Sequence, residues 1–246
     1  MKLALIGYGA MGQLVAAGAR KAGDDVGVVL TSKEGVLPVE QLTERLRGHD
    51  VAVDFSIGEA VLKNVDACAR AQVCLVEGTT GWKQYENAAR QIMTEHSSGM
   101  VYGANFSTGV NLFYRVAAHA AALFAAVEGY SPFIEEAHHN RKRDAPSGTA
   151  LKLRELMSEH LGPDIPTAST RAGFIPGTHR VGFDSEADQV LLTHTARSRQ
   201  GFANGALLAA HWIAGRTGVF EFGEVIEEII ANCQLPIANL RDQTTK

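Results

Sequence analysis

Near the start of the chain, Lys-Leu-Ala-Leu-Ile at residues 2–6 is followed directly by Gly-Tyr-Gly-Ala-Met-Gly at residues 7–12. The first run is short, continuous and mostly apolar, which is typical of a strand buried on both faces of a parallel sheet. Residues 13–22 are rich in Ala, Leu and Val at helical spacing. A strand, a Gly-x-Gly-x-x-Gly turn and a helix in this order form the fingerprint of a unit that binds a dinucleotide.

The glycines of this turn have separate expected roles. The first permits the tight turn, the second lets the backbone approach a pyrophosphate, and the third lets the helix pack closely on the strand. Free N–H groups at the start of the helix would face the phosphates. Because glycines also make ordinary βα turns, the prediction depends on this strand–turn–helix context. The predicted cofactor-binding residues of the turn are Gly7, Tyr8, Gly9, Ala10, Met11 and Gly12.

Apolar runs and amphipathic segments alternate through residue 106 and predict an α/β fold with a doubly wound parallel sheet. From residue 109 the pattern changes, with a long Ala-rich segment and later strands that alternate like antiparallel ones. Strands are expected at residues 26–30, 51–56, 73–77, 100–103, 131–137, 179–184 and 189–196. Helices are expected at residues 37–47, 59–71, 85–95, 111–127, 148–161, 205–214 and 222–231, and a loop at residues 163–168.

Two polar segments follow expected strands, at the sheet edge where ligands bind in such folds. Thr31, Ser32 and Lys33 follow the second strand, and two hydroxyls with a cation suit the 2′-phosphate of NADPH. The acidic Glu34 comes next, so use of NADH as well stays open, as does an ordinary solvated loop. The segment Gly78, Thr79 and Thr80 follows the fourth strand and is predicted to line the same site.

A second candidate site lies in Glu-Glu-Ala-His-His-Asn-Arg-Lys-Arg-Asp-Ala-Pro-Ser-Gly-Thr-Ala at residues 135–150. His138 or His139 can supply a proton near neutral pH. Lys142 can donate a proton or hold a carboxylate. The start of the following helix offers free N–H groups and two hydroxyls, which suit a bound carboxylate. The residues at this helix start are Ser147, Gly148 and Thr149.

Two other interpretations of this segment are open. It can be a basic surface loop that precedes an ordinary capped helix. The adjacent histidines also suggest a metal site, but no acidic residue or cysteine stands at a ligand spacing from them, and Lys142 would repel a cation. We therefore expect no metal.

The composition is that of a soluble globular enzyme, with 46% apolar and 20% charged residues and a net charge of −4. We expect no nucleic-acid partner, because the short basic run at residues 141–143 is interrupted by Asp144 and lacks aromatic neighbours. No apolar run reaches the ~18 residues that span a membrane, and the early glycines argue against a signal peptide. Cys68, Cys74 and Cys233 are predicted to be small core residues in a reducing compartment, which indicates the cytoplasm.

Motifs along the whole chain resemble those of the dihydrodipicolinate reductase family, the 4-hydroxy-tetrahydrodipicolinate reductases of lysine and diaminopimelate synthesis. The most specific motif is Glu-Ala-His-His-Asn-Arg-Lys-Arg-Asp-Ala-Pro-Ser-Gly-Thr-Ala at residues 136–150. The others are Gly7–Gly12, Asp54-Phe55-Ser56, Gly78–Gly81, residues 105–107 with 109–111, Arg171-x-Gly173, Gly177-x-His179, and Arg199 with residues 202–206.

The resemblance implies a Rossmann-like cofactor domain with an inserted α+β domain built on a mixed sheet. The cofactor domain would comprise residues 1–108 and 217–246, and the substrate-binding and tetramerisation domain residues 109–216. The inserted sheet would pair across subunits in a homotetramer, and hinges would lie near residues 107–109 and 215–218.

The resemblance also implies residue roles. His138 would be the catalytic proton donor and acceptor, and Lys142 a proton donor. His139 would bind substrate carboxylates together with Gly148 and Thr149. Arg199 is similar to a residue that reaches the cofactor when the domains close. The implied cofactor-lining residues are the Gly7–Gly12 turn, Gly78, Thr79, Thr80, Gly103, Ala104, Asn105 and Phe106.

The implied reaction is hydride transfer from NADPH, or also NADH, to a cyclic hydroxy-imine dicarboxylate with loss of water. Many family members carry an acidic residue where this chain has Thr31-Ser32-Lys33, which bears on the choice of cofactor. A reductase of another small cyclic or imine dicarboxylate is the alternative enzyme. A non-catalytic dinucleotide sensor would keep the glycine turn but would not need His138 with Lys142.

Overall fold

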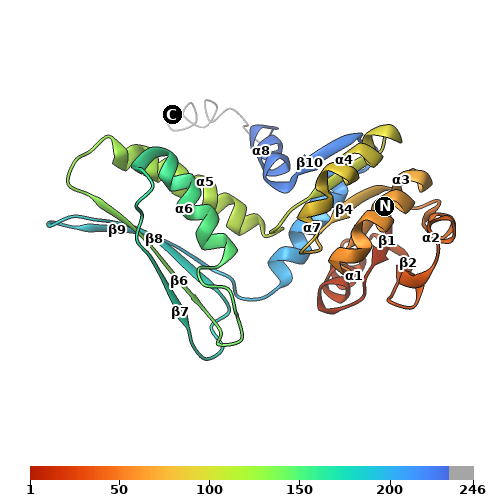
Figure 1. Cartoon of the computed structure of the whole chain (residues 1–246), viewed down its shortest axis with the longest axis horizontal. Coiled ribbons are helices and arrows are strands. Elements are labelled where there is room, and N and C mark those ends of the chain that lie inside the picture. The colour runs from red at the N-terminus through yellow and green to blue at the C-terminus, as the bar shows by residue number, and fades with distance from the viewer. Residues whose placement is uncertain (233–246) are drawn as a thin grey trace, which may run out of the picture. The chain divides into compact units, whose positions relative to one another are not determined.

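The computed structural model describes residues 1–232 and consists of two compact units (Figure 1). Of the described residues, the first unit contains 1–106 and 202–232, and the second contains 107–201. The expected boundary at residue 216 therefore lies instead after Gly201. The reason is the alanine-rich face of helix α7 (Gln200–Ile213), which packs into the core of the first unit. Cys233 lies outside the described residues.

The first unit is built on a parallel sheet in the order β10-β5-β4-β3-β1-β2. The strand order turns at β1, because β2 pairs with one side of β1 and β3 with the other. Such a switch point opens a crevice at the carboxyl ends of the strands. The strands are β1 (Lys2–Ile6), β2 (Asp25–Leu30), β3 (Val51–Asp54), β4 (Cys74–Glu77), β5 (Gly99–Tyr102) and β10 (Gly218–Glu221).

Helices cover both faces of this sheet, because consecutive residues of a buried strand point to opposite faces. Leu3 and Leu5 pack into the cluster formed with α1, α7 and α8, whereas Ala4 and Ile6 pack into the cluster formed with α2, α3 and α4. The helices are α1 (Ala10–Lys21), α2 (Val39–Leu46), α3 (Val61–Ala71), α4 (Glu86–Glu95) and α8 (Phe222–Asn232), with short 3₁₀ turns at η1 (Glu34–Val36), η2 (Gly58–Ala60) and η3 (Lys83–Tyr85).

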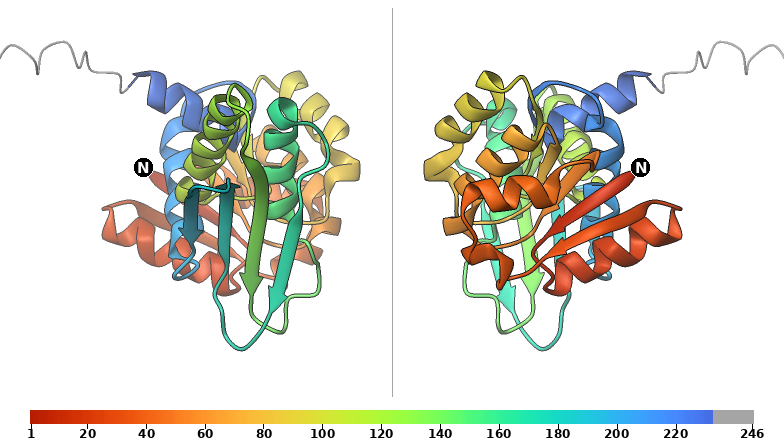
Figure 2. Two further views of the ribbon diagram at one scale, coloured as in Figure 1. Left: turned by 90° about the vertical axis from the view of Figure 1, so that its left-hand side faces the viewer. Right: turned by 90° about the vertical axis from the view of Figure 1, so that its right-hand side faces the viewer.

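The second unit is a mixed sheet in the order β7-β6-β8-β9 with two helices on one face. Strand β6 (Ser131–His138) pairs parallel with β7 (Thr167–Arg171) and antiparallel with β8 (Thr178–Asp184), which pairs with β9 (Gln189–Thr195). Figure 1 shows α5 (Thr108–Ala125) and α6 (Gly148–Leu161) side by side on this sheet, and the left view of Figure 2 shows the face opposite them.

The burial of β6 alternates along its second half, because Ile134, Glu136 and His138 are buried whereas Glu135 is exposed. The period of two places Glu136 and His138 on the same face as Ile134, which packs beneath α5 and α6. The strand therefore carries two polar side chains into the layer between the sheet and its helices.

The predicted architecture is confirmed, with two strands missed, β7 and β10. Strand β7 begins inside the predicted loop at residues 163–168 and continues to Arg171. It is a short edge strand with the sequence Thr-Ala-Ser-Thr-Arg, which lacks the apolar alternation that predicts strands. Helix α7 also begins at Gln200, earlier than predicted. Among residues 1–232, no helix has the length and apolar character that crossing a membrane requires.

Candidate active site

The glycine turn of the first unit has the geometry that a pyrophosphate site needs. Gly7 has a φ of +86°, and a Cβ there would come within 2.5 Å of the carbonyl oxygen of Phe55. A Cβ at Gly12 would lie 2.2 Å from the carbonyl oxygen of Gly7, so only glycine allows helix and turn to pack this closely. A Cβ at Gly9 would meet nothing within 4 Å, which leaves the backbone at the start of α1 open to a ligand.

The loop after β2 is held by Glu34. Its Oε2 accepts hydrogen bonds from the backbone N–H and the hydroxyl of Thr31, at 2.8 and 2.7 Å. The bond from the Thr31 hydroxyl, followed by the bond from its N–H, lowers the pKa of Glu34. Ser32 and Lys33 remain exposed at the carboxyl end of the sheet.

Other predicted cofactor residues follow β4 and β5, and they differ in exposure. Gly78 lies against the ring of Phe55, where a Cβ would approach within 2.2 Å. Phe106 is only 2% exposed, and its ring packs 4.8 Å from that of Phe222. The aromatic ring thus belongs to the core, and the neighbouring backbone is the part of this segment that can meet a ligand. Tyr8, Thr80 and Ala104 are exposed, Thr79 is buried, and Gly103 and Asn105 are half-buried.

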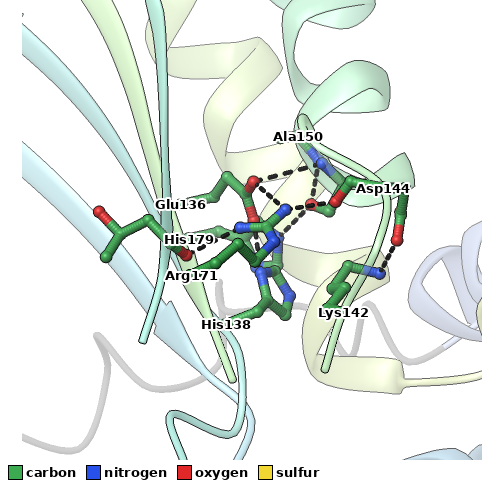
Figure 3. A network of polar contacts seen from close by, with 9 residues as sticks. Glu136, His138, Lys142, Asp144, Ala150, Arg171 and His179 are labelled. Atoms are coloured by element: carbon green, nitrogen blue, oxygen red, sulfur yellow. Dashed lines mark hydrogen bonds and ion pairs between the residues drawn. The ribbon is translucent and has the colours of Figure 1, made fainter. Parts of the chain in front are cut away.

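In the second unit a buried carboxylate organises the histidines. The Glu136 side chain is fully buried, and its Oε1 lies 2.6 Å from Nη2 of Arg171. Its Oε2 contacts Nδ1 of His138, and Oε1 also accepts a hydrogen bond of 3.3 Å from the backbone N–H of Ser147. Burial alone would raise the pKa of Glu136, but the hydrogen bonds from Arg171 and Ser169 and the nearby positive charge lower it to about 2. Figure 3 shows the side chains of Glu136, His138 and Arg171 converging.

The two buried histidines are neutral at neutral pH. Burial lowers the pKa of His138, although the Glu136 carboxylate opposes this shift. Burial, followed by the nearby His138, lowers the pKa of His179 to about 4. Their rings meet edge to face with centroids 5.0 Å apart. Gly177 allows the His138 ring to fit, because a Cβ there would lie 3.2 Å from Nε2.

Ser147 links these histidines to helix α6. Its Oγ caps the helix by accepting a hydrogen bond of 3.3 Å from the N–H of Ala150, and it lies 3.0 Å from Nε2 of His179. Since His179 is neutral, the hydroxyl can donate to that nitrogen while it accepts from Ala150. Ser147 is only 2% exposed, so its hydroxyl is committed to these partners.

The remaining predicted residues of the second unit are more accessible than the buried histidines. A Cβ at Gly148 would meet nothing within 4 Å, so the first turn of α6 is accessible. The Thr149 hydroxyl hydrogen-bonds to Tyr114 of α5. Nζ of Lys142 lies 2.9 Å from Oδ1 of Asp144, with 26% of the Lys142 side chain exposed. His139 is half-buried directly after β6.

Arg199 lies apart from this cluster in the chain. It is exposed in the segment between β9 and α7, within the second unit.

One expectation about metals needs correction. Glu136, His138 and His179 bring possible ligand atoms within 4.8 Å of one another, so an acidic residue does stand at a ligand spacing. Arg171 already neutralises Glu136, however, and Lys142 adds a second cation that lowers the pKa of His138. These two cations disfavour a metal ion at this cluster.

Sequence reasoning missed Glu136, Arg171 and His179 as site residues. Glu136 could have been found, because it stands two positions before His138 and a strand places such residues on one face. Arg171 and His179 stand in motifs that resemble the family's, but the sequence did not show that Arg171 reaches Glu136, because strand β7 and its pairing with β6 were not predicted.

The open glycine turn on a doubly wound sheet, together with an α+β unit that holds neutral histidines near Arg171 and Lys142, indicates an oxidoreductase that uses a nicotinamide dinucleotide. Family models described as dihydrodipicolinate reductase, N-terminus and C-terminus, match residues 1–106 and 109–226. The chain belongs to the dihydrodipicolinate reductase family.

Curated relatives and solved structures agree with this assignment. A 4-hydroxy-tetrahydrodipicolinate reductase of Christiangramia forsetii is 35% identical, over 94% of this chain and 100% of that protein. The enzyme of the same name from Neisseria meningitidis is 35% identical, over 87% of this chain and 86% of its own. The fold is similar to that of a dipicolinate-bound dihydrodipicolinate reductase from Paenisporosarcina sp. TG-14, with a TM-score of 0.77, 21% identity, and coverage of 92% of this chain and 99% of that one.

Proposed function

We propose that this protein reduces 4-hydroxy-tetrahydrodipicolinate to tetrahydrodipicolinate in lysine and diaminopimelate synthesis. The observation that carries the proposal is the pairing of a buried, neutral His138 with the accessible N-terminus of α6 and with Lys142. A proton-transfer group and an anion site are what a cyclic dicarboxylate requires during reduction. One hydride and one proton enter, and one water leaves.

Each site residue has a proposed role. His138 exchanges a proton with the substrate through Nε2, since its Nδ1 faces Glu136. Lys142 donates a proton or neutralises a carboxylate, for which it must leave Asp144. His139, Gly148 and Thr149 hold the substrate carboxylates at the start of α6. Ser147 contributes by capping α6 and orienting His179, since its own hydroxyl is committed.

The first unit is proposed to hold the cofactor. The accessible backbone at Gly9 fits the pyrophosphate, and the segments that include Thr79, Thr80 and Ala104 line the rest of the site. A bound NAD(P)H supplies the hydride. We propose NADPH as the preferred form, with NADH also used, because Lys33 is exposed at the end of β2 whereas the carboxylate of Glu34 is engaged by Thr31.

We propose three further features that the family resemblance implies for this chain. The second unit is proposed to bind substrate and to form a homotetramer through its sheet, and Arg199 to contact the cofactor. We also propose the cytoplasm as the compartment, in keeping with the free, buried thiols of Cys68 and Cys74.

The decisive experiment is NADPH oxidation that depends on substrate generated from pyruvate and aspartate semialdehyde by the preceding condensing enzyme. We expect oxidation only when that enzyme and both precursors are present, and inhibition by dipicolinate, a planar dicarboxylate. If NADPH is consumed with another cyclic imine dicarboxylate but not with this substrate, the protein is still a reductase of imine dicarboxylates, but the proposed substrate is wrong. If the dinucleotide binds without turnover of any imine, the sensor hypothesis replaces the enzyme.

A further inference from the structure

A pair of buried acids lies below the proposed cofactor site of the first unit. Asp54 ends strand β3 and Glu77 ends the neighbouring strand β4, and the two are partners in the parallel register. Partners in adjacent strands point to the same face of a sheet. Both residues are fully buried.

Hydrogen bonds tie this pair to two loops at the carboxyl edge of the sheet. Asp54 Oδ1 accepts a bond of 2.8 Å from the N–H of Ser56, and its Oδ2 accepts one of 2.7 Å from Nδ2 of Asn64 in α3. Glu77 Oε1 accepts a bond of 2.7 Å from the N–H of Thr79. The Thr79 hydroxyl in turn lies 3.4 Å from Oδ1 of Asp54. The two carboxyl groups thus hold the backbone that follows β3 and the backbone that follows β4.

The groups that face the pair in residues 1–232 are neutral. The titratable groups that face it are Cys68 from α3 and Tyr102, the register partner of Glu77 in β5. Burial raises the pKa of both, so neither is charged at neutral pH. The guanidinium of Arg90 in α4 is engaged with the Tyr102 hydroxyl. Within the described part of the chain, no lysine or arginine is among the main groups that shift the pKa of Asp54 or Glu77.

Two adjacent carboxyl groups in such a place cannot both be ionised. Burial raises the pKa of Asp54, and burial together with the nearby Asp54 raises that of Glu77 well above its usual value. Asp54 accepts more hydrogen bonds and is the better carboxylate. Glu77 Oε2 is buried and accepts no hydrogen bond, as expected of a protonated oxygen that faces Asp54.

We propose that Glu77 is a positioning residue for the dinucleotide site, which acts as a neutral acid that shares its proton with Asp54 and fixes the Gly78–Thr80 loop through the N–H of Thr79. Loss of the proton would place two carboxylates side by side and separate the loops after β3 and β4. This inference rests on the proposed function, in which these loops line the cofactor.

The inference predicts how the site responds to pH. A group whose pKa is raised by folding contributes stability at low pH, and that stability is lost as pH rises from the unfolded value through the folded one. The loop should therefore loosen, and the dinucleotide should bind more weakly, on the alkaline side.

The test measures the dissociation constant of NADPH by its fluorescence from about pH 6 to about pH 9.5. The wild-type protein should lose affinity by ~10-fold or more across this range. Glu77→Gln keeps an acceptor for Thr79 and a donor for Asp54, so its affinity should match the wild type at low pH and stay nearly constant. Glu77→Met lacks both groups and should bind weakly throughout. The exposed Glu95 of α4 provides the matched control, because Glu95→Gln should keep the wild-type pH dependence.

Several outcomes separate the two proposals. Equal pH dependence of the wild type and Glu77→Gln, with normal NADPH binding, would overturn the role of Glu77 and leave the proposed function intact. A wild-type protein that binds neither NADPH nor NADH would overturn both. If Glu77→Gln does not fold, infrared spectra of the wild type decide, because a buried neutral acid gives a carbonyl band at neutral pH that is lost at alkaline pH. Absence of that band would overturn the inference.

Discussion

Arg171 donates a hydrogen bond of 2.6 Å to Glu136, although 35 positions separate the two residues in the chain. The contact joins the end of edge strand β7 to the middle of the proposed active site on β6. It keeps Glu136 ionised in a buried position, and the ionised carboxylate in turn faces His138. A residue from a strand that carries no proposed catalytic group thus sets the electrostatics of the proposed proton-transfer group.

The first prediction concerns the carboxylate itself. Glu136→Gln should lower kcat by ~10–100-fold with little change in KM, because His138 would lose the partner that orients its ring and favours a proton on Nδ1. Steady-state kinetics with enzymatically generated substrate measure the change. Glu135→Gln is the matched control, since Glu135 lies on the other face of β6 and pairs with Arg180. Equal effects of both substitutions would remove Glu136 from the mechanism.

The second prediction concerns Arg171. Arg171→Met leaves the buried carboxylate of Glu136 without its cation and should lower the free energy of unfolding by about 3 kcal/mol at neutral pH. Folding lowers the pKa of Glu136 to about 2, so this stability is present above the usual carboxyl pKa and is lost as pH falls towards 2. The deficit of the variant should accordingly shrink in acid.

Hydrogen exchange of peptides from β6 and β8 is the suitable measurement of this change, because Trp82 and Trp212 both lie in the first unit. Arg180→Met, which removes an exposed partner of Glu135, should have little effect. A deficit that stays constant down to the lowest pH would show that Arg171 acts by packing alone.

The third prediction concerns the buried His179. Folding lowers its pKa to about 4, so the second unit should lose stability as pH falls from about 6.5 through 4, by up to about 3 kcal/mol. His179→Gln should flatten this part of the pH dependence in the same exchange measurement. His160→Gln at the exposed end of α6 should leave it unchanged. An unaltered slope in His179→Gln would mean that other groups cause the acid sensitivity.

The fourth prediction separates chemistry from binding at the start of α6. Lys142→Ala should lower kcat by ~10²–10⁴-fold if Lys142 transfers a proton, whereas Lys152→Ala on the exposed face of α6 should not. Thr149→Val should instead raise KM more than it lowers kcat, because a carboxylate contact is made in the ground state as well. Near-normal turnover of Lys142→Ala, or a pure kcat effect of Thr149→Val, would contradict these roles.

The fifth prediction tests the choice of cofactor. Lys33→Glu should lower kcat/KM for NADPH by ~10-fold or more relative to NADH, because a carboxylate would repel the 2′-phosphate. Lys21→Glu, at the far end of α1, changes the net charge equally and should leave the ratio of the two cofactors unchanged. A wild-type protein that strongly prefers NADH would contradict the interpretation of Thr31, Ser32 and Lys33.

Local patterns were sufficient for most of the architecture. The period of the apolar residues predicted the parallel sheet and most of its helices, and the spacing of Gly7, Gly9 and Gly12 predicted a turn whose close contacts the structure reproduces. These features depend on neighbours in sequence, where steric rules act directly. Strand β7 was not predicted, because an edge strand of small polar residues is defined by its pairing partner and not by its own sequence pattern.

The sequence by itself determined which two sets of functional groups this protein carries. One is the dinucleotide-binding turn near the N-terminus, and the other is a histidine, a lysine and a helix start at Gly148 in the middle of the chain. Only the tertiary structure decided how those groups are charged. Arg171 reaches Glu136 across the register of β6 and β7, and Asp54 meets Glu77 across that of β3 and β4. Charge states depend on burial and on partners within a few ångströms, and such partners come from strands that the sequence does not pair.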